Sequence, residues 1–253
     1  YCSVSGGANN KALGGGSSIS GGNGNEATGN QASISGGVLN KATEMYASVG
    51  GGWGNTAGGQ AACISGGRYN KASGDYSYVG GGGGPDSTTG NEAFSHYSAV
   101  LGGQLNMAGD NSNPSDHTSG QFAAVSGGFH NTASGIVSSI SGGYTNMAGG
   151  NYSSISGGIR NTASGSISSI SGGDDNTSAG QYSSISGGRY NKARGKYSFI
   201  GGGGHPTNPD RGNTAYADYS AILGGADNET GDSSAGETAR ASCISGGYSN
   251  ATS

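Results

Sequence analysis

The sequence predicts an all-β fold, a parallel β-solenoid whose 15-residue coils each hold two short strands, and three observations carry that prediction. The phrase Ser-Ile-Ser-Gly-Gly recurs with its central β-branched residue mostly 15 positions apart. An asparagine follows six positions behind that residue in nearly every repeat. Around both columns the residues alternate, which is the period-2 pattern of strands and not the 3.6-residue pattern of helices.

Composition excludes several other classes of protein. With 57 Gly in 253 residues, 31% hydrophobic and 10% charged, the chain lacks the apolar area of a single wide core. A flexible Gly/Ser linker has no such strict period, and collagen needs glycine at every third position. The net charge of -4 gives no basic stripe, and no apolar run reaches the ~18 residues of a membrane span. We therefore expect no nucleic acid partner and no membrane span in this chain.

The apolar column runs through the whole sequence, one residue per coil for fifteen coils. A short strand cannot bury its apolar face alone, but stacked on copies of itself it builds a continuous core. We predict a buried ladder formed by Val4, Ile19, Ile34, Val49, Ile64, Val79, Val100, Val125, Ile140, Ile155, Ile170, Ile185, Ile200, Ile222 and Ile244.

The asparagine column is the costly one to bury, because a buried amide must be hydrogen-bonded. Stacked asparagines about 4.8 Å apart can bond the next amide or the turn backbone. In two coils extra residues precede the asparagine. We assign a structural role to Asn10, Asn25, Asn40, Asn55, Asn70, Asn91, Asn106, Asn131, Asn146, Asn161, Asn176, Asn191, Asn213, Asn228 and Asn250.

Strand parity assigns side chains to the core or to the surface. If Ile19 points inward, so does Ser17, while Ser18 points outward. On the second strand of that coil we expect Asn25 inside and Glu26 outside. The Gly-Gly pair between the strands supplies positive φ for the turn. The alternation predicts strands of four or five residues.

A longer repeat of about 120 residues is visible in the positions of the insertions. Because the sequence starts at Tyr1 and ends inside the repeat pattern, we expect a targeting segment elsewhere, and either a longer chain or ends that stack on further copies. The expected organisation is a first super-repeat at residues 1–124 with insertions near 83–90 and 110–120, a second at 125–243 with insertions near 204–212 and 231–240, and the start of a further coil at 244–253.

An aromatic column precedes the serines of the first strand and faces outward or sits at a corner. One interpretation is a stacked corner ladder that shields backbone, and the other is a contact with a subunit or ligand. Besides Tyr1, this possible contact column contains Tyr46, Tyr76, Tyr97, Phe122, Tyr152, Tyr182, Tyr197 and Tyr219.

No catalytic motif, P-loop or calcium-binding motif is found, and the Gly-x-Gly-x-x-Ala match at residues 52–57 has no βαβ unit around it. We therefore expect no enzyme activity, no catalytic residue, no cofactor and no metal site. The cysteines Cys2, Cys63 and Cys243 have neither zinc-ligand spacing nor an even number. The insertions gather titratable groups, and the alternatives there are solvated loops or a metal or carbohydrate site built from Asp86, His96, Asp110, Asp116, His117, His205, Asp210 and Arg211.

The unit Ser-x-Ile-Ser-Gly-Gly-x-x-Asn-x-Ala-x-Gly resembles the head repeats of trimeric autotransporter adhesins of the YadA type, over essentially the whole chain. It is also similar to repeats of tail-fibre-like and secreted surface proteins. The resemblance implies a left-handed roll, a homotrimer and attachment to surfaces. The family unit is usually one residue shorter, with Ala-Ile-Gly where this chain has Ser-Ile-Ser-Gly-Gly.

These patterns together favour an extracellular or cell-surface fibre or adhesin segment. We expect it to self-associate as a homotrimer or filament, with surface glycans or matrix as further candidate partners. Ice binding is an alternative, because the Ser-Ile-Ser columns present a flat array of hydroxyls. A phage-like tail-fibre shaft and a polysaccharide-degrading enzyme are further alternatives.

Overall fold

The computed structural model describes residues 1–231 and 241–252. Its regular structure consists of two-residue strands and one short 3₁₀ turn, η1 (Pro209–Arg211). The odd-numbered strands are β1 (Ser3–Val4), β3 (Ser18–Ile19), β5 (Ser33–Ile34), β7 (Ser48–Val49), β9 (Cys63–Ile64), β11 (Tyr78–Val79), β13 (Ala99–Val100), β15 (Ala124–Val125), β17 (Ser139–Ile140), β19 (Ser154–Ile155), β21 (Ser169–Ile170), β23 (Ser184–Ile185), β25 (Phe199–Ile200), β27 (Ala221–Ile222) and β29 (Cys243–Ile244). The even-numbered strands are β2 (Lys11–Ala12), β4 (Glu26–Ala27), β6 (Lys41–Ala42), β8 (Thr56–Ala57), β10 (Lys71–Ala72), β12 (Glu92–Ala93), β14 (Met107–Ala108), β16 (Thr132–Ala133), β18 (Met147–Ala148), β20 (Thr162–Ala163), β22 (Thr177–Ser178), β24 (Lys192–Ala193), β26 (Thr214–Ala215), β28 (Glu229–Thr230) and β30 (Ala251–Thr252).

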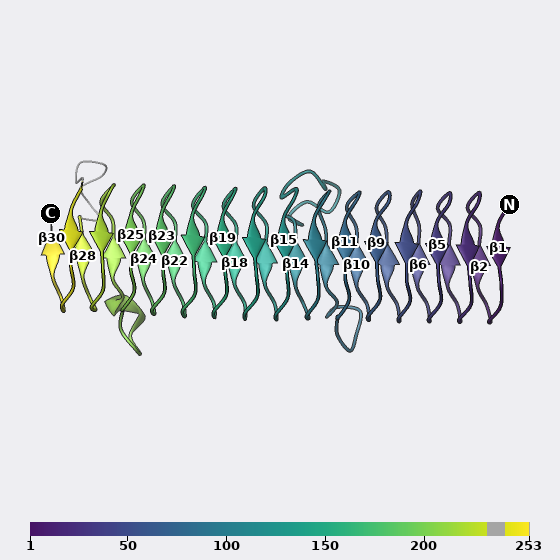
Figure 1. The fold of residues 1–253 in the computed structure, drawn as a ribbon, viewed down its shortest axis with the longest axis horizontal. Helices are drawn as coiled ribbons and strands as arrows, with labels where there is room; N and C mark the ends of the chain where they lie inside the picture. Colours follow the sequence, from purple (N-terminus) through teal and green to yellow (C-terminus); the bar gives the residue numbers. More distant parts are fainter. Residues whose placement is uncertain (232–240, 253) are drawn as a thin grey trace. The chain divides into compact units, whose positions relative to one another are not determined.

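The strands form two parallel sheets of 15 strands each, with odd strands in one and even strands in the other (Figure 1). Pairing is in register from coil to coil, as when Ser18–Ile19 pairs with Ser33–Ile34. This is a parallel β-solenoid, which confirms the predicted fold class. The chain divides into two compact units, Tyr1–Ile136 with β1–β16 and Val137–Ser253 with β17–β30. The super-repeats proposed at 1–124 and 125–243 stay a prediction about the sequence.

The strands are shorter than the expected four or five residues, because three corners divide each coil. In one coil of the second unit Gly143, Thr145 and Tyr152 have φ of 98°, 55° and 59°. A residue in the left-handed region cannot continue a strand. Between the first two corners a single residue forms a parallel bridge to the next coil, as Tyr144 does with Ile159.

The core lies between the two sheets of each unit and is narrow. The apolar column fills it together with the alanine column, as shown by Ile155 at 1% exposure and Ala163 at 0%. The predicted parity holds in the second coil, where Ser17, Ile19 and Asn25 are buried. Outward Ser18 and Glu26 are only half-buried.

Val4 differs from the buried position predicted for it and is 47% exposed. The reason is local, because in the structure the coil of Val4 pairs with another coil on one side only. The same one-sided position leaves Asn10 half-buried and Asn250 exposed. The other members of both predicted columns are buried.

The buried asparagine side chains bond the backbone of two coils at once, as Asn161 shows. Its Nδ2 donates to the Gly157 carbonyl of its own coil at 3.1 Å and to the Gly173 carbonyl of the next at 3.0 Å. Its Oδ1 accepts from the backbone N–H of Asn176 at 3.1 Å. The backbone N–H of Asn161 in turn donates to Oδ1 of Asn146 at 3.0 Å. The buried side-chain amide therefore has hydrogen-bond partners for both N–H groups and for its oxygen.

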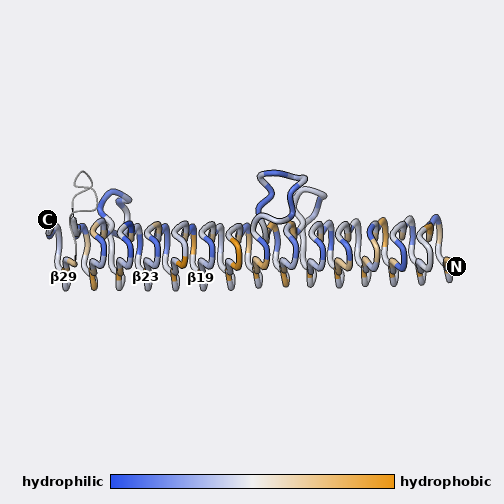
Figure 2. Tube along the Cα trace, turned by 90° about the horizontal axis from the view of Figure 1, so that it is seen from above, coloured by the Kyte–Doolittle hydropathy of each residue, from blue (hydrophilic) through white to orange (hydrophobic). Residues whose placement is uncertain are grey.

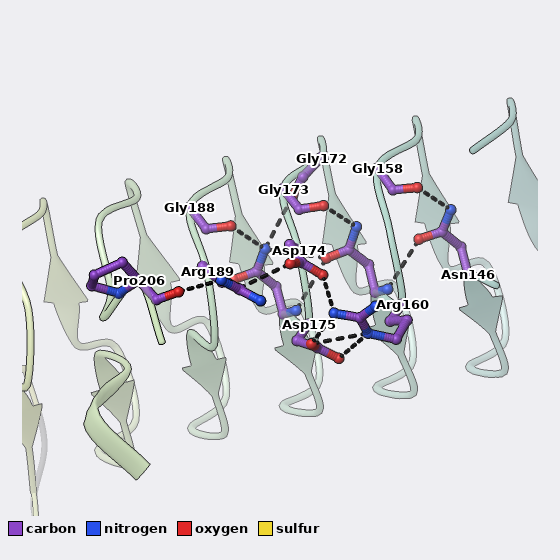
Figure 3. Close-up of polar contacts among 12 residues, drawn as sticks. Asn146, Gly158, Arg160, Gly172, Gly173, Asp174, Asp175, Gly188, Arg189 and Pro206 are labelled. Carbon is purple, nitrogen blue, oxygen red and sulfur yellow. Dashed lines mark hydrogen bonds and ion pairs between the residues drawn. The ribbon is translucent and has the colours of Figure 1, made fainter. Parts of the chain in front are cut away.

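The same arrangement recurs along both units, and Figure 3 shows a stretch of it in which Asn146 donates to Gly158 at 2.9 Å. The coils with insertions keep it. Asn91 donates to the Gly81 carbonyl across the insertion at 2.9 Å, and Asn213 donates to the Gly202 carbonyl at 2.9 Å. The inserted residues therefore leave the hydrogen-bond ladder intact.

The two glycines of each Gly-Gly pair have different roles. The second one, Gly173, has φ of +96°, and a Cβ there would lie 2.2 Å from the Gly188 carbonyl oxygen and 2.4 Å from Nδ2 of Asn176. The first one, Gly172, would place a Cβ in open space. Only the second glycine is required by the close approach of consecutive coils.

Within the described residues, three insertions leave the regular coils. Residues 84–90 lie between the Gly83 bridge and Asn91, residues 109–121 join β14 to β15, and residues 205–212, which include η1, precede Asn213. These loops are hydrophilic and protrude from the coils of their own unit (Figure 2). The insertion expected near 231–240 lies outside the described residues apart from residue 231.

Replacing Asn161 by alanine removes the bonds to two turn carbonyls and to one backbone N–H. Because each buried polar group left without a partner costs about 1–3 kcal/mol, we expect a destabilisation on the order of 3 kcal/mol or more. Thermal unfolding followed by circular dichroism, with hydrogen exchange at the Asn176 amide, measures it. The control is Thr162→Ala on the outward position beside it, expected within about 0.5 kcal/mol of the parent. Equal effects of the two substitutions would contradict the proposed ladder.

A matched pair of glycine substitutions tests the turn. Gly173→Ala forces a methyl group into the next coil and a side chain into positive φ, so we expect a loss of about 2–4 kcal/mol. Gly172→Ala meets nothing and is expected to be neutral or to stabilise by up to about 1 kcal/mol. The measurement is the melting temperature of each variant under the same conditions. A Gly172→Ala variant as unstable as Gly173→Ala would refute this description of the turn.

Candidate interaction surfaces

The outward face of the odd-numbered sheet consists largely of small side chains. In the second unit Phe199 and Leu223 are exceptions. Two rows of serine hydroxyls run along the sheet over the four coils of β17, β19, β21 and β23. One row is half-buried or exposed and the other is exposed; together they contain Ser139, Ser154, Ser169, Ser184, Ser141, Ser156, Ser171 and Ser186. Because strands pair in register, each hydroxyl lies above its equivalent, and the face is flat and regular. We call this surface the serine face.

The even-numbered sheet presents a different outward surface with charged and larger side chains. In the first unit, Lys11 pairs with Glu26, which pairs with Lys41. In the second unit the same position holds Met147, Thr162 and other residues of mixed size. Opposite charges on neighbouring strands support the register. The two faces of a coil are therefore chemically distinct.

The predicted aromatic column lies at the third corner of the coil, in the left-handed region and exposed. Tyr76 and Tyr97 have φ of 56° and 59°, and Tyr182 and Tyr197 have φ of 59° and 56°. Each corner backbone N–H is held by the preceding coil, as when Tyr197 donates to the Gln181 carbonyl at 2.9 Å. Of the two positions considered, outward or corner, the rings occupy the corner and are exposed there.

Within this column the rings stack only where consecutive coils both carry an aromatic residue. In the first unit, Tyr76, Tyr97 and Phe122 form one ladder with centroid separations of 5.2 and 4.9 Å. Tyr46 has no aromatic neighbour in this column, because Gln31 and Ala61 occupy the equivalent corners of the coils before and after it. We call the stacked runs the corner ladders. Whether a subunit or ligand contacts them stays a prediction.

The positive φ of these corners is a feature that sequence reasoning missed. A left-handed backbone costs a non-glycine residue about 1–2 kcal/mol, and even the β-branched residues Val137 and Ile167 adopt it, with φ of 56° and 57°. One signal was present in the sequence. Glycine occupies the equivalent corner once, as Gly16 with φ of 75°, and the corner before the asparagine twice, as Gly24 and Gly54.

An ion-pair cluster covers the corner before the asparagine ladder in the second unit (Figure 3). Both Nε and Nη2 of Arg160 donate to Asp175, at 2.6 to 3.0 Å, and Nη2 also donates to Asp174 at 2.8 Å. Arg189 approaches Asp174 at 2.9 Å. The hydrogen bonds that Arg160 donates to the Asp175 carboxylate raise the pKa of its guanidinium above the usual value. Because Arg160 is exposed and its partners are only half-buried, these ion pairs contribute little to stability, and they link neighbouring coils.

The first unit brings two of the predicted insertion histidines together. The rings of His96 and His117 lie 5.9 Å apart, and His117 also packs against Phe94 at 4.4 Å. His117 Nδ1 donates to the Phe94 carbonyl at 2.7 Å, whereas His96 Nδ1 accepts from the Asp75 N–H at 2.9 Å. Both imidazoles thus bond backbone atoms of the coils, at Asp75 and Phe94.

Three further insertion residues, Asp86, Asp116 and His205, accept hydrogen bonds from residues two or three positions later in the chain. Asp86 accepts from the Thr88 N–H at 2.9 Å and hydroxyl at 2.6 Å, and Asp116 makes the same bonds with Thr118 at 2.8 and 2.6 Å. These bonds hold the pKa of both carboxyls below the usual value. In the second unit His205 Nδ1 accepts from Asn208 N–H at 3.0 Å.

The other insertion residues of the hypothesis, Asp110, Asp210 and Arg211, also have local partners. Asp110 accepts from the Ser112 N–H at 3.0 Å, and Asp210 donates its N–H to Asn208 at 2.9 Å. Arg211 donates to the Tyr248 hydroxyl. Within residues 1–231 and 241–252, no three His, Cys, Asp or Glu side chains are placed to hold a metal ion.

The second unit has a surface hollow of about 390 Å³ beside its corner ladder, lined in part by Gln181, Arg194, Tyr216 and Asp218. Its arginine lies 5.3 Å from the ring centroid of Tyr216. The residues that line it lie between β22 and β23, between β24 and β25, and between β26 and β27.

The described part of the chain holds no helix with the length and apolar character of a membrane span. No protein-family model matches the chain, and no curated protein sequence matches it.

Proposed function

We propose that this chain is a structural segment of an extracellular or cell-surface fibre or adhesin, without catalytic activity. The observation that carries the proposal is the repetition of the same buried contacts in coil after coil. Asn25 in the first unit and Asn161 in the second make equivalent bonds to turn glycines, with Nδ2 to carbonyl distances of 2.9 to 3.1 Å. A sequence constrained at every coil in this way specifies a regular scaffold rather than one unique pocket.

The serine face is the surface through which we propose that copies of the chain associate. The coils on either side of Ser154 and Ser156 also carry serines at these positions, so another sheet can approach closely there. The narrow core also favours association, because a coil buries little apolar area by itself. A homotrimer, as the YadA-type repeat suggests, and a filament are the two assemblies that fit.

The insertion loops are the parts we propose for attachment to a surface or to glycans. They are hydrophilic, they leave the coils without disturbing the asparagine ladder, and they hold capped turns such as Asp116–Thr118. Loops on a rigid scaffold are common places for binding residues.

A double substitution on the serine face tests self-association. In Ser156→Arg/Ser186→Arg, two charged side chains stand where we expect a second sheet to pack. We expect the parent chain to sediment as an oligomer in analytical ultracentrifugation and the variant to sediment as a monomer, with unchanged circular dichroism. The control, Thr162→Arg/Thr214→Arg, adds the same charge to the even-numbered sheet and should keep the oligomer. A parent chain that is monomeric at every concentration, with no fibres in electron micrographs, would overturn the proposal.

Ice binding is the second candidate, and the regular hydroxyl rows of the serine face are the observation that favours it. The rows are serine, whereas Thr162 and Thr177 lie on the other sheet, between Met147 and Lys192. We therefore expect no thermal hysteresis from the purified chain in a nanolitre osmometer. Faceted ice growth together with a freezing gap that Ser156→Arg/Ser186→Arg removes would establish ice binding instead.

A further inference from the structure

The corner ladder of the second unit holds three tyrosines in unusually close order. Ring centroids lie 4.6 Å apart for Tyr182 and Tyr197 and 5.0 Å apart for Tyr197 and Tyr219. The ring planes differ by only 4° and 8°. The separations match the spacing of parallel strands, so the rings repeat as the coils do.

The backbone fixes this arrangement. The N–H of Tyr197 donates to Gln181 at 2.9 Å, and the N–H of Tyr219 donates to Lys196 at 2.8 Å. The corner conformation, with φ of 56° and 58° at these two tyrosines, sends both rings out on the same side. The rings are nevertheless accessible, with 47% and 58% of each residue exposed.

The stacked arrangement determines which ligands and reagents can reach these rings. Each inner ring face is covered by the neighbouring tyrosine, which leaves little face for a sugar to stack on. The edges and the phenol hydroxyls stay in solvent, where an oxidant can reach them. A phenol that loses one electron and one proton becomes a phenoxyl radical whose unpaired spin lies partly on the ring carbons next to the oxygen-bearing carbon. Two such radicals combine through orbitals perpendicular to the rings, and face-to-face rings present these orbitals to each other.

We propose that this ladder is an oxidative cross-linking site, at which a one-electron oxidant joins Tyr197 to Tyr182 or to Tyr219 as dityrosine. A peroxidase with hydrogen peroxide is the class of oxidant that suits the reaction. Two phenols each give up one electron and one proton, and one hydrogen peroxide is reduced to two waters. A carbon–carbon bond forms between the two ortho positions, and each ortho carbon then releases its hydrogen as a proton while its phenoxyl oxygen regains one.

The product is a covalent link between consecutive coils. It closes a loop through one coil of the chain and so restricts the unfolded ensemble. The first unit carries a shorter version of the site, Tyr76 and Tyr97 at 5.2 Å and 1°. There Phe122 continues the stack at 4.9 Å but has no hydroxyl to oxidise.

To test the proposal, the full chain is treated with peroxidase and hydrogen peroxide at low protein concentration. Cleavage after lysine and arginine places Tyr182, Tyr197 and Tyr219 in three different peptides. We expect dityrosine fluorescence, a chain that still migrates as a monomer in denaturing gels, and linked peptide pairs lighter by two hydrogens than their sum. We also expect the oxidised chain to melt at a higher temperature than the untreated one.

Two single substitutions separate the ladder from ordinary tyrosine oxidation. Tyr197→Phe keeps the stack, as Phe122 does in the first unit, but should abolish both linked pairs of the second unit. Tyr152→Phe is the control, because Tyr152 is an exposed corner tyrosine with Val137 and Ile167 at the equivalent corners. It should leave both pairs unchanged. The proposal is overturned if the parent chain forms links only between chains, or if Tyr197→Phe and Tyr152→Phe give the same yields of both linked pairs.

Discussion

The buried asparagine amide is the interaction on which the rest of the structure depends. Its Nδ2 bonds a turn carbonyl of its own coil and one of the next, and its Oδ1 accepts from the backbone of the asparagine that follows, as Asn161 does with Gly157, Gly173 and Asn176. The bonds require the second turn glycine to approach so closely that a Cβ would collide. This geometry explains the fixed spacing of Gly-Gly and Asn in the sequence. The same bonds set the register of both sheets.

The same interaction explains how the chain tolerates insertions. Asn91 and Asn213 each bond a turn carbonyl on the far side of a loop, at 2.9 Å. The loop can vary in length as long as the asparagine returns to its column, since loop closure costs free energy only slowly with length. The regular coils thus keep one geometry, whereas the loops can vary in length and sequence.

Much of the fold could be predicted from the sequence, because period, parity and register are all consequences of repetition. The columns of Ile155 and Asn161 were identified from spacing alone. The corners were not, because a tyrosine at positive φ contradicts local propensity and is held there by the preceding coil, as Tyr197 is by the Gln181 carbonyl. From the sequence, the aromatic column fits both a stacked corner ladder and a contact with a subunit or ligand. Which tyrosines stack depends on whether the neighbouring coil has an aromatic residue at the same corner, and the approach of His96 to His117 depends on the path of a loop with no period at all.

Hydrogen bonds from asparagine side chains to turn carbonyls are the central claim, and they can be observed directly. In a nuclear magnetic resonance spectrum of the isotope-labelled chain, scalar coupling across a hydrogen bond identifies the donor nitrogen and the acceptor carbonyl. The structure requires such couplings from Nδ2 of Asn161 to the carbonyls of Gly157 and Gly173, with side-chain amide protons that exchange slowly with solvent. Asparagine side-chain protons that exchange as fast as those of a free amide, with no coupling to glycine carbonyls, would contradict it.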